Sequence, residues 1–267
     1  MRIVKKNVIV GISVVAAIFF IIFFFKRNSS DHGGQGVQPL YQQALAFRND
    51  GELLKAKEIY QQILTEYPDF QDIEKIQKEL GELNLAIIFS NTPTPDSVIH
   101  EVEPGDSIIK LAQKYQTTAE VIKKNNNLQG DVIRIGQKLR IWTGEFNVFV
   151  DKSQNVLLLK ESDEVVKVYL VSTGANNSTP VGEFKIINKL VDPVWFNKGA
   201  VVPPESPANV LGSRWLGFDI PGYGIHGTVE PETIGQQVTA GCVRMANQDV
   251  EEIYTILPVG TKVTIVD

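Results

Sequence analysis

Cysteine, histidine and concentrated positive charge are all scarce in this sequence of 267 residues. It contains one Cys and three His, and its formal net charge is -5. No Lys/Arg-rich run is present that could neutralise a phosphate backbone, so nucleic acid is excluded as the main partner. A single Cys can form no internal disulfide, and Cys242 is therefore either a small buried residue or a working thiol.

The sequence also lacks the clustered ligands of a metal centre. His32, His100 and His226 lie in three separate regions, and neither an HExxH nor a CxxC spacing occurs. We therefore expect no metal. A papain-like protease is excluded as well, because such enzymes place the Cys early in the domain and the His far downstream, whereas here His226 precedes Cys242.

One long apolar run is present near the N-terminus. Residues 8–25 carry no charge, and basic residues flank them at Lys5, Lys6, Lys26 and Arg27. The run reaches the minimum of about 17 to 20 residues that a helix needs to cross a bilayer. A cleaved signal peptide is the alternative, but its apolar region is usually shorter, and no small-x-small cleavage site precedes Lys26. We therefore predict an uncleaved anchor.

The charges around this run predict its orientation. The amino terminus and three basic residues precede the run, whereas two basic residues follow it, and the more positive side of a span usually stays in the cytoplasm. Residues 1–27 are therefore expected to form a cytoplasmic tip and one transmembrane helix in the cell membrane, with the body outside. Residues 28–38, rich in Ser, Gly and Gln, are expected to be a flexible spacer.

Residues 39–90 have a helical pattern. Apolar residues recur at helical spacing on both sides of a break at residues 49–51, and several positions resemble a single tetratricopeptide repeat: Leu40, Ala44, Phe47, Ala56, Tyr60 and Pro68. One such hairpin cannot bury its own face, so a further helix is expected over residues 73–89. The hairpin is then either a spacer or the groove for a protein partner.

Residues 91–97 form a Pro-rich linker, and residues 98–142 predict a small βααβ module. A strand over residues 98–102 is followed by a turn and two short helices. Asp106 or Ser107 can cap the first helix, and a capping-box pattern from Thr117 to Glu120 begins the second. A strand over residues 134–142 closes the module.

This module resembles a LysM domain. The resemblance is carried by residues 100–107 (HEVEPGDS), 111–112, Tyr115, 117–118, Asn125 and 135–139 (IGQKL). LysM domains bind glycans that contain N-acetylglucosamine, so the resemblance implies attachment to the glycan strands of peptidoglycan. By the same resemblance, sugar contacts would fall on the loops near residues 105–108 and 125–129.

Residues 145–267 alternate apolar and polar residues in short runs and contain many Gly and Pro. Strands are expected in this segment at residues 147–151, 156–160, 165–171 and 262–266, and one short helix at residues 247–257. The pattern predicts a mostly-β domain rather than a parallel α/β sheet.

The same segment contains a candidate nucleophile and a candidate base. Cys242 lies in residues 239–245 (TAGCVRM) and His226 lies in residues 223–228 (YGIHGT), so both have Gly beside them. Glycine permits close approach of the backbone to a substrate. A thiol becomes a nucleophile when an imidazole takes its proton, and neighbouring backbone amides can hold a developing oxyanion. Acyl transfer follows if the fold brings the two segments together.

Six segments strongly resemble the YkuD-type L,D-transpeptidase domain: residues 171–174, 179–184, 208–209, 211–215, 225–227 and 241–245. This resemblance implies acyl transfer on peptidoglycan stem peptides, in cell-wall biogenesis and the maintenance of cell shape, without a cofactor. The thiolate would attack the carbonyl of the third residue of a stem and release the terminal D-Ala. The amine of a second stem would then form a 3→3 cross-link, whereas water would give an L,D-carboxypeptidase.

The resemblance also implies roles for individual residues. Cys242 would be the nucleophile and His226 the base and later proton donor, with the imidazole oriented by the Gly227 carbonyl. The amides of Gly241 and Cys242, with Ala240 as a third candidate, would form the oxyanion hole. Further residues would contact substrate or support the site: Arg244, which either holds its loop or meets stem-peptide carboxylates, Tyr223 and Trp195 as cleft wall, and Trp215 as core.

One departure from the family pattern stands next to the nucleophile. The family commonly has Ser-His-Gly-Cys where this chain has Thr239-Ala240-Gly241-Cys242. Thr239 retains the hydroxyl, but the second His is absent. If the position contributes only its backbone amide, Ala240 is harmless; otherwise the rate or the donor preference should change. The alternative to an active enzyme is a peptidoglycan-binding scaffold with an inactive transpeptidase-like domain.

Overall fold

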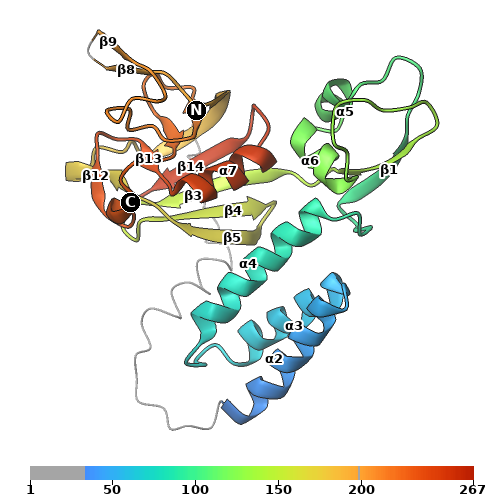
Figure 1. Cartoon of the computed structure of the whole chain (residues 1–267). Helices are drawn as coiled ribbons and strands as arrows, with labels where there is room; N and C mark the ends of the chain where they lie inside the picture. Colours follow the sequence, from blue (N-terminus) through green and yellow to red (C-terminus); the bar gives the residue numbers. More distant parts are fainter. Residues whose placement is uncertain (1–33, 198) are drawn as a thin grey trace, which may run out of the picture.

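The computed structural model describes residues 34–197 and 199–267. The predicted membrane span over residues 8–25 lies outside this part of the chain. Within the described part, no helix is long and apolar enough to cross a membrane. The described residues form a helical module, a small βααβ module and a larger mostly-β domain (Figure 1).

The helical module consists of α2 (Gly34–Asn49), α3 (Leu53–Glu66) and α4 (Ile73–Phe89). Ala44, Ala56 and Tyr60 are fully buried, as close contact between helices requires. The hydroxyls of Tyr41 and Tyr60 both donate to the carboxylate of Glu79 on α4, at 2.9 and 2.8 Å. The additional helix expected over residues 73–89 is therefore present, and it covers the hairpin.

Helix α2 begins at Gly34, five residues before the helical region that was expected from residue 39. Residues 34–38, expected to belong to a flexible spacer, already form its first turn. Val37 is fully buried, and this tertiary packing outweighs the weak helix propensity of a Gly-rich segment. Gly36 allows the close contact, because a Cβ there would lie 2.6 Å from the Tyr67 hydroxyl oxygen.

The βααβ module consists of β1 (Ser97–Glu101), α5 (Ile108–Lys114), α6 (Ala119–Asn125) and β2 (Lys138–Trp142). The two strands pair antiparallel, from Ser97↔Trp142 to Glu101↔Lys138. The two helices pack on this pair around a small core of their own: Val102, Ile108, Leu111, Ala112, Ile122, Leu139 and Ile141. The order of elements agrees with the sequence pattern.

Two details of this module differ from the sequence pattern. Ser107 caps α5 as expected, but the cap of α6 is Thr118 rather than Thr117, and its hydroxyl accepts from Val121 N at 3.0 Å. The closing strand begins at Lys138 rather than at residue 134. The preceding residues form a turn, in which Gln137 N donates to Arg134 O at 2.9 Å.

An eight-stranded sheet forms the centre of the mostly-β domain, in the order β13-β11-β10-β7-β14-β3-β4-β5. Its strands are β3 (Phe146–Asp151), β4 (Val156–Glu161), β5 (Glu164–Leu170), β7 (Gly182–Val191), β10 (Arg214–Phe218), β11 (Gly224–His226), β13 (Val243–Arg244) and β14 (Lys262–Val266). Most neighbours are antiparallel, but β14 pairs parallel with β3, and β11 pairs parallel with β13. The predicted mostly-β architecture is confirmed.

The remaining elements lie around this sheet. Helix α7 (Asn247–Ile256) follows β13 directly and packs against β10 and β11. Strand β6 (Thr173–Gly174) pairs with β12 (Gln237–Thr239). The short helix η1 (Ala175–Asn177) follows β6, and the short helix η2 (Pro231–Thr233) precedes β12. Strands β8 (Trp195–Asn197) and β9 (Ala200–Val202) form a hairpin that projects from the domain (Figure 1).

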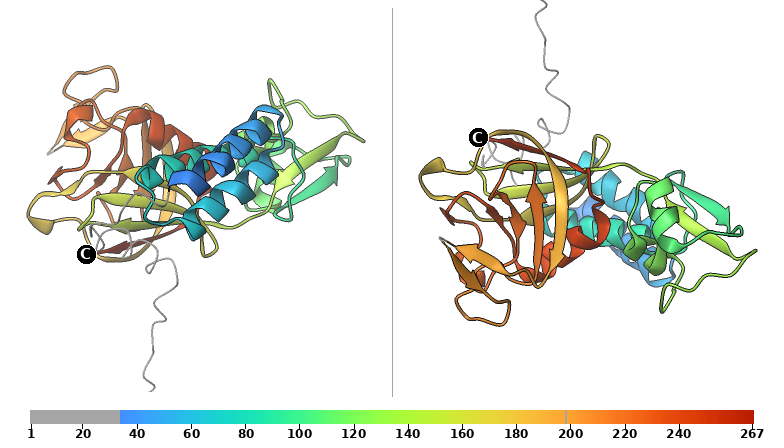
Figure 2. Two further views of the ribbon diagram at one scale, coloured as in Figure 1. Left: turned by 90° about the horizontal axis from the view of Figure 1, so that it is seen from below. Right: turned by 90° about the horizontal axis from the view of Figure 1, so that it is seen from above.

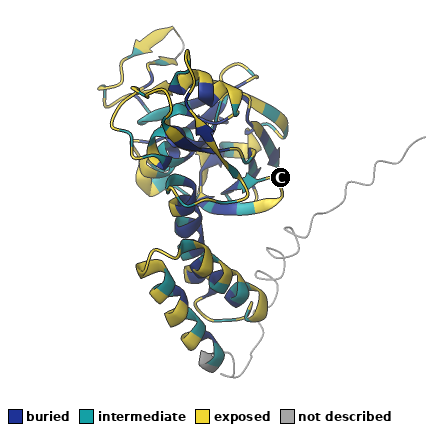
Figure 3. Cartoon of the chain, turned by 90° about the vertical axis from the view of Figure 1, so that its right-hand side faces the viewer, coloured by how far each residue is buried: buried dark blue, intermediate teal, exposed yellow. Residues whose placement is uncertain are grey.

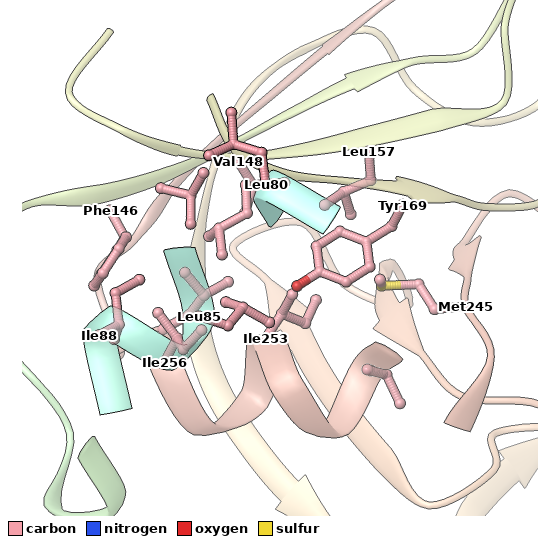
Figure 4. Packing of buried hydrophobic residues seen from close by; sticks show 14 of the residues in the cluster. Leu80, Leu85, Ile88, Phe146, Val148, Leu157, Tyr169, Met245, Ile253 and Ile256 are labelled. Atoms are coloured by element: carbon pink, nitrogen blue, oxygen red, sulfur yellow. The ribbon is translucent and has the colours of Figure 1, made fainter. Parts of the chain in front are cut away.

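Helix α4 connects all three parts of the molecule. It lies between the α2–α3 hairpin and the sheet, and its C-terminal end reaches the βααβ module (Figure 2). Buried residues are concentrated along this helix in Figure 3. Leu85 and Ile88 of α4 meet Phe146 of the sheet and Ile256 of α7 in one core (Figure 4). Each such buried side chain contributes about 1.5–3 kcal/mol.

Candidate active site

Cys242 and His226 are brought together by two neighbouring parallel strands. His226 ends β11, and Cys242 directly precedes β13; the strands pair with Ile225 opposite Val243 and His226 opposite Arg244. This register places Cys242 at the level of Gly224, at the entry of β13. The two Gly-flanked segments therefore meet at one edge of the sheet.

The Cys242 side chain is half-buried, and its thiol donates to Gly222 O at 3.5 Å. Burial raises the pKa of the Cys242 thiol above its ordinary value, although the Gly224 backbone and the charge of Arg244 act in the opposite direction. The group is therefore a neutral thiol near pH 7. Because the thiolate is the nucleophile, a base must remove this proton during attack.

His226 is the candidate base and is only 3% exposed. Its Nδ1 lies 2.7 Å from Gly227 O, and because a carbonyl can only accept, Nδ1 carries the proton and Nε2 is the basic nitrogen. Burial lowers the pKa of His226 to about 4, while the hydrogen bond to Gly227 opposes this shift. The imidazole is thus uncharged near pH 7, which is the form that accepts a proton.

Trp215 forms a wall against the imidazole. Its ring stacks on His226 with a centroid distance of 6.0 Å and an interplanar angle of 21°. Its indole Nε1 donates to Asn188 Oδ1 at 3.0 Å, which fixes the ring. Trp215 was expected in the core but is partly exposed, and it lies on β10 opposite His226 of β11.

Asn247, the first residue of α7, was missed by the sequence interpretation. Its Oδ1 accepts from Thr228 N at 2.9 Å and from Ser213 N at 3.2 Å, and its Nδ2 donates to Thr228 O at 2.9 Å. A Cβ on Gly227 would lie 2.2 Å from Asn247 Oδ1, so this approach requires glycine. Asn247 thereby fixes the backbone that orients His226.

The loop before Cys242 is held by the Thr239 hydroxyl. This hydroxyl donates to Cys242 O at 2.7 Å and accepts from Gly241 N at 3.2 Å. The Gly241 amide, expected in the oxyanion hole, is therefore engaged inside the loop. The amides of Ala240 and Cys242 have no acceptor among residues 34–197 and 199–267, and they are the donors available to an oxyanion.

Tyr223 covers this loop from the outside. Gly241 has φ +132, and a Cβ there would lie 2.7 Å from Tyr223 Cε1 and 3.1 Å from Ser178 O. Glycine is therefore required at this position for both its conformation and its space. Ala240 next to it is exposed, so a larger side chain would extend into solvent.

Arg244 holds the loop around η2. Its side chain is buried, and Nη1 donates to Glu230 Oε2 and to Thr233 Oγ1, each at 2.8 Å. Its backbone exchanges two hydrogen bonds with Ser172. Of the two roles considered for Arg244, these contacts favour the structural one. Its charge also lowers the pKa values of both His226 and Cys242.

Trp195 lies on the β8–β9 hairpin, whose base is fixed by Asn209. The buried amide of Asn209 donates to Pro193 O at 2.8 Å, Val202 O at 3.3 Å and Pro203 O at 3.2 Å. These carbonyls come from both ends of the hairpin. Asn209 is one of the residues that carry the family resemblance, and its structural role is to hold the two ends of this hairpin together.

The loop near residues 125–129, which was expected to contact sugar, is exposed only in part. Asn125 is fully buried and donates to Ile88 O at 2.7 Å, so it is unavailable to a glycan. Beside the loop that follows α6, a groove of about 620 Å³ is lined by Leu128, Val132, Arg134, Ile135, Gly136 and Gln137.

In the part of the chain that the structure describes, no group of three or more His, Cys, Asp or Glu residues could hold a metal ion.

Comparison with known proteins gives the family. The model of the YkuD L,D-transpeptidase catalytic domain matches residues 145–265, and the LysM model matches residues 100–142. The YkuD protein of Bacillus licheniformis, whose name assigns it as an L,D-transpeptidase, is 32% identical over 176 residues, which cover 63% of this chain and 98% of that protein. The YqjB protein of Bacillus subtilis, similarly named, is 41% identical over 130 residues, covering 46% of this chain and 73% of that protein.

A solved structure, an L,D-transpeptidase from Mycobacterium smegmatis, has 18% identity and a TM-score of 0.40, and the match covers 50% of this chain and 65% of that one. The sequence matches establish the family. The chain belongs to the YkuD family of L,D-transpeptidases and carries a LysM domain before its catalytic domain.

Proposed function

We propose that this protein joins peptidoglycan stem peptides by 3→3 cross-links, through a thioacyl-enzyme on Cys242. Membership of the L,D-transpeptidase family supports the activity. The observation that carries the assignment to residues is the placement of a half-buried thiol at the entry of β13, beside the strand that bears an uncharged His226.

The first half of the reaction releases D-Ala. His226 Nε2 takes the proton of the Cys242 thiol while the sulfur attacks the carbonyl of the third stem residue. The amides of Ala240 and Cys242 hold the negative charge on that oxygen. The C–N bond then breaks, the imidazolium gives its proton to the departing D-Ala amine, and a thioester remains. The Gly227 carbonyl stabilises the imidazolium through Nδ1.

The second half transfers the acyl group. The side-chain amine of a second stem loses a proton to His226 and attacks the thioester carbonyl, which forms an amide and breaks the C–S bond. The proton returns to sulfur, so Cys242 is restored as a thiol. Water in place of the amine gives a free tripeptide stem, which is the carboxypeptidase outcome.

The LysM domain is proposed to hold the glycan strands that carry these stems. Residues 1–27 are proposed to anchor the protein in the cell membrane with its body facing the cell wall, which is supported by the uncharged run and the excess of basic residues before it. Residues 39–90 serve as a spacer rather than a partner groove, a role supported by the contact of α4 with both α3 and the sheet.

The activity is tested with the full-length protein in detergent, incubated with disaccharide tetrapeptides and analysed by mass spectrometry, with Cys242→Ala as the matched control. Dimers joined 3→3 that are absent with Cys242→Ala support the proposal. Tripeptides alone indicate a carboxypeptidase. No conversion by a folded protein with a reduced thiol would leave the scaffold alternative.

Membrane attachment is tested separately by fractionating cells that express the full chain or a variant lacking residues 1–27. The full chain should be recovered with membranes and be accessible to protease added outside, whereas the shortened variant should not be membrane-bound. Recovery of both in the same soluble fraction would contradict the anchor.

A further inference from the structure

A buried arginine of the LysM domain lies at the end of helix α4. Arg140 on β2 is 3% exposed. Its Nη1 donates to Ser90 O at 2.6 Å and to Ile88 O at 3.3 Å, and its Nη2 donates to Thr94 Oγ1 at 3.3 Å. Lys138, two residues earlier on the same strand, is exposed. The Arg140 side chain is thus buried against the end of α4 and the linker that follows it.

Asn125 of the LysM domain binds the same end of the helix. It is fully buried, and its Nδ2 donates to Ile88 O at 2.7 Å and to Ser90 O at 3.2 Å. The last carbonyls of a helix lack intrahelical partners and carry the negative end of its dipole. A cation and an amide from the LysM domain therefore both donate to this end of α4, and the helix carbonyls are acceptors for the buried guanidinium.

The same helix is attached to the catalytic domain further along its length. The buried Asn84 donates to Val166 O on β5 at 2.8 Å. Lys167, also buried, bridges Glu82 of α4 at 2.8 Å and Glu252 of α7 at 2.7 Å. Breaking either contact would leave buried polar groups without partners, which is costly. Helix α4 is therefore fixed at both domains.

A second contact joins the LysM domain to the catalytic domain directly. The hydroxyl of Thr118, which caps α6, donates to Thr255 O on α7 at 2.5 Å. The LysM domain is thus held both at α4 and at α7. Together with the hydrogen bond from Trp142 Nε1 on β2 to Glu161 Oε1 on β4 at 3.1 Å, these attachments oppose rotation of the domain about the short connection at residues 143–145.

We propose that Arg140 and Asn125 are positioning residues, which hold the LysM domain at a fixed offset from Cys242 so that the enzyme selects donor stems on a glycan strand bound by the same molecule. This inference rests on the proposed function. A fixed offset raises the effective concentration of those stems that lie at the matching distance along the strand. A short soluble donor cannot reach both sites and gains nothing.

The test compares the full-length protein with the double variant Arg140→Ala/Asn125→Ala, and Lys138→Ala serves as the control from the same strand. Rates are measured on disaccharide tetrapeptides and on long, uncross-linked glycan strands with tetrapeptide stems. Sedimentation with peptidoglycan reports glycan binding. The double variant should keep its glycan binding and its rate on the short donor, and its rate on strands should fall about tenfold. Lys138→Ala should change neither rate.

For each protein, the rate on glycan strands is divided by the rate on disaccharide tetrapeptides. If this ratio were the same for the wild type and for a double variant that is folded and binds glycan, the inference would be overturned. A second measurement needs no variant: wild-type rates on strands of graded length should rise sharply once a strand spans both sites, and a rate independent of length would also overturn it. Failure of the wild type to convert even the short donor would instead contradict the proposed function, so the two failures are distinguishable.

Discussion

The peptide group between Gly227 and Thr228 connects Asn247 to His226. Its carbonyl accepts from His226 Nδ1 at 2.7 Å, and its N–H donates to Asn247 Oδ1 at 2.9 Å. Asn247 also donates to Thr228 O at 2.9 Å, so its amide binds the backbone of Thr228 on both sides. The orientation of the imidazole therefore depends on the first side chain of α7.

Replacement of Asn247 by Ala should lower kcat by about 10- to 100-fold, because a small displacement of a catalytic group has an effect of this size. Asn247→Asp keeps the acceptor for Thr228 N but loses the donor to Thr228 O, so its kcat should lie between those of the wild type and Asn247→Ala. Steady-state kinetics and the pH dependence of Cys242 alkylation would report the change. Gln248→Ala, at the exposed neighbouring position, is the control. If Asn247→Ala had the same kcat as Gln248→Ala, Asn247 would not orient the imidazole.

The pH dependence of thiol activation should follow the lowered pKa of His226. The imidazole accepts a proton only when uncharged, and burial lowers its pKa from 6.5 to about 4. The rate of Cys242 alkylation by iodoacetamide should therefore hold as the pH falls from about 7 to about 5 and decline near 4. In His226→Ala the alkylation should be slower throughout. A decline centred near 6.5 would show that the imidazole is not buried as described.

Restoring the family residue at position 240 should have little effect. Ala240 is exposed, and its backbone amide is one of the two available oxyanion donors. We expect Ala240→His to change kcat/KM by less than about threefold, since surface substitutions rarely disturb a site. Kinetics on disaccharide tetrapeptides would measure this. A larger gain would mean that a side chain here contributes to thiol activation, and that this chain lacks that contribution.

The stability of the molecule should depend on pH through Glu161. This carboxyl accepts from Trp142 Nε1 at 3.1 Å, and burial raises its pKa from 4.5 to about 7. The protonated form is favoured in the folded state, so its stabilising contribution is complete below pH 4.5 and is lost as the pH rises through about 7. Glu161→Gln should therefore raise the melting temperature at pH 8 more than at pH 4.5. Equal shifts at both pH values would contradict the raised pKa of this partly buried carboxyl.

Sequence patterns predicted the regular elements well where period and flanking turns were clear. The strand at Lys262–Val266 and the helix beginning at Asn247 lie where the alternation and the helical spacing indicated. Short strands such as β11 and β13 have too few residues to show a period, and their pairing joins segments that are far apart in the chain. The prediction that Cys242 and His226 belong to one active site came from a family resemblance and not from a local sequence pattern.

The residues that were missed or misjudged act through backbone atoms of distant segments. The partners of Asn247 are main-chain groups of Ser213 and Thr228, which leave no mark in the sequence. Arg140 and Asn125 are polar residues in a small domain, where exposure is the usual expectation. Their burial depends on α4, a helix from another module, and no periodicity within residues 98–142 could reveal it.

Strand β14 is the last strand in the chain order, yet it occupies an interior position of the sheet, between β7 and β3. Its parallel pairing with β3 joins residues 262–266 to residues 147–151. During synthesis β3 and β7 therefore emerge long before the strand that separates them, and their edges stay open until residue 266 has been made. The catalytic domain cannot fold stepwise as it emerges, and the thiol at residue 242 gains its final surroundings only when translation of the domain is complete.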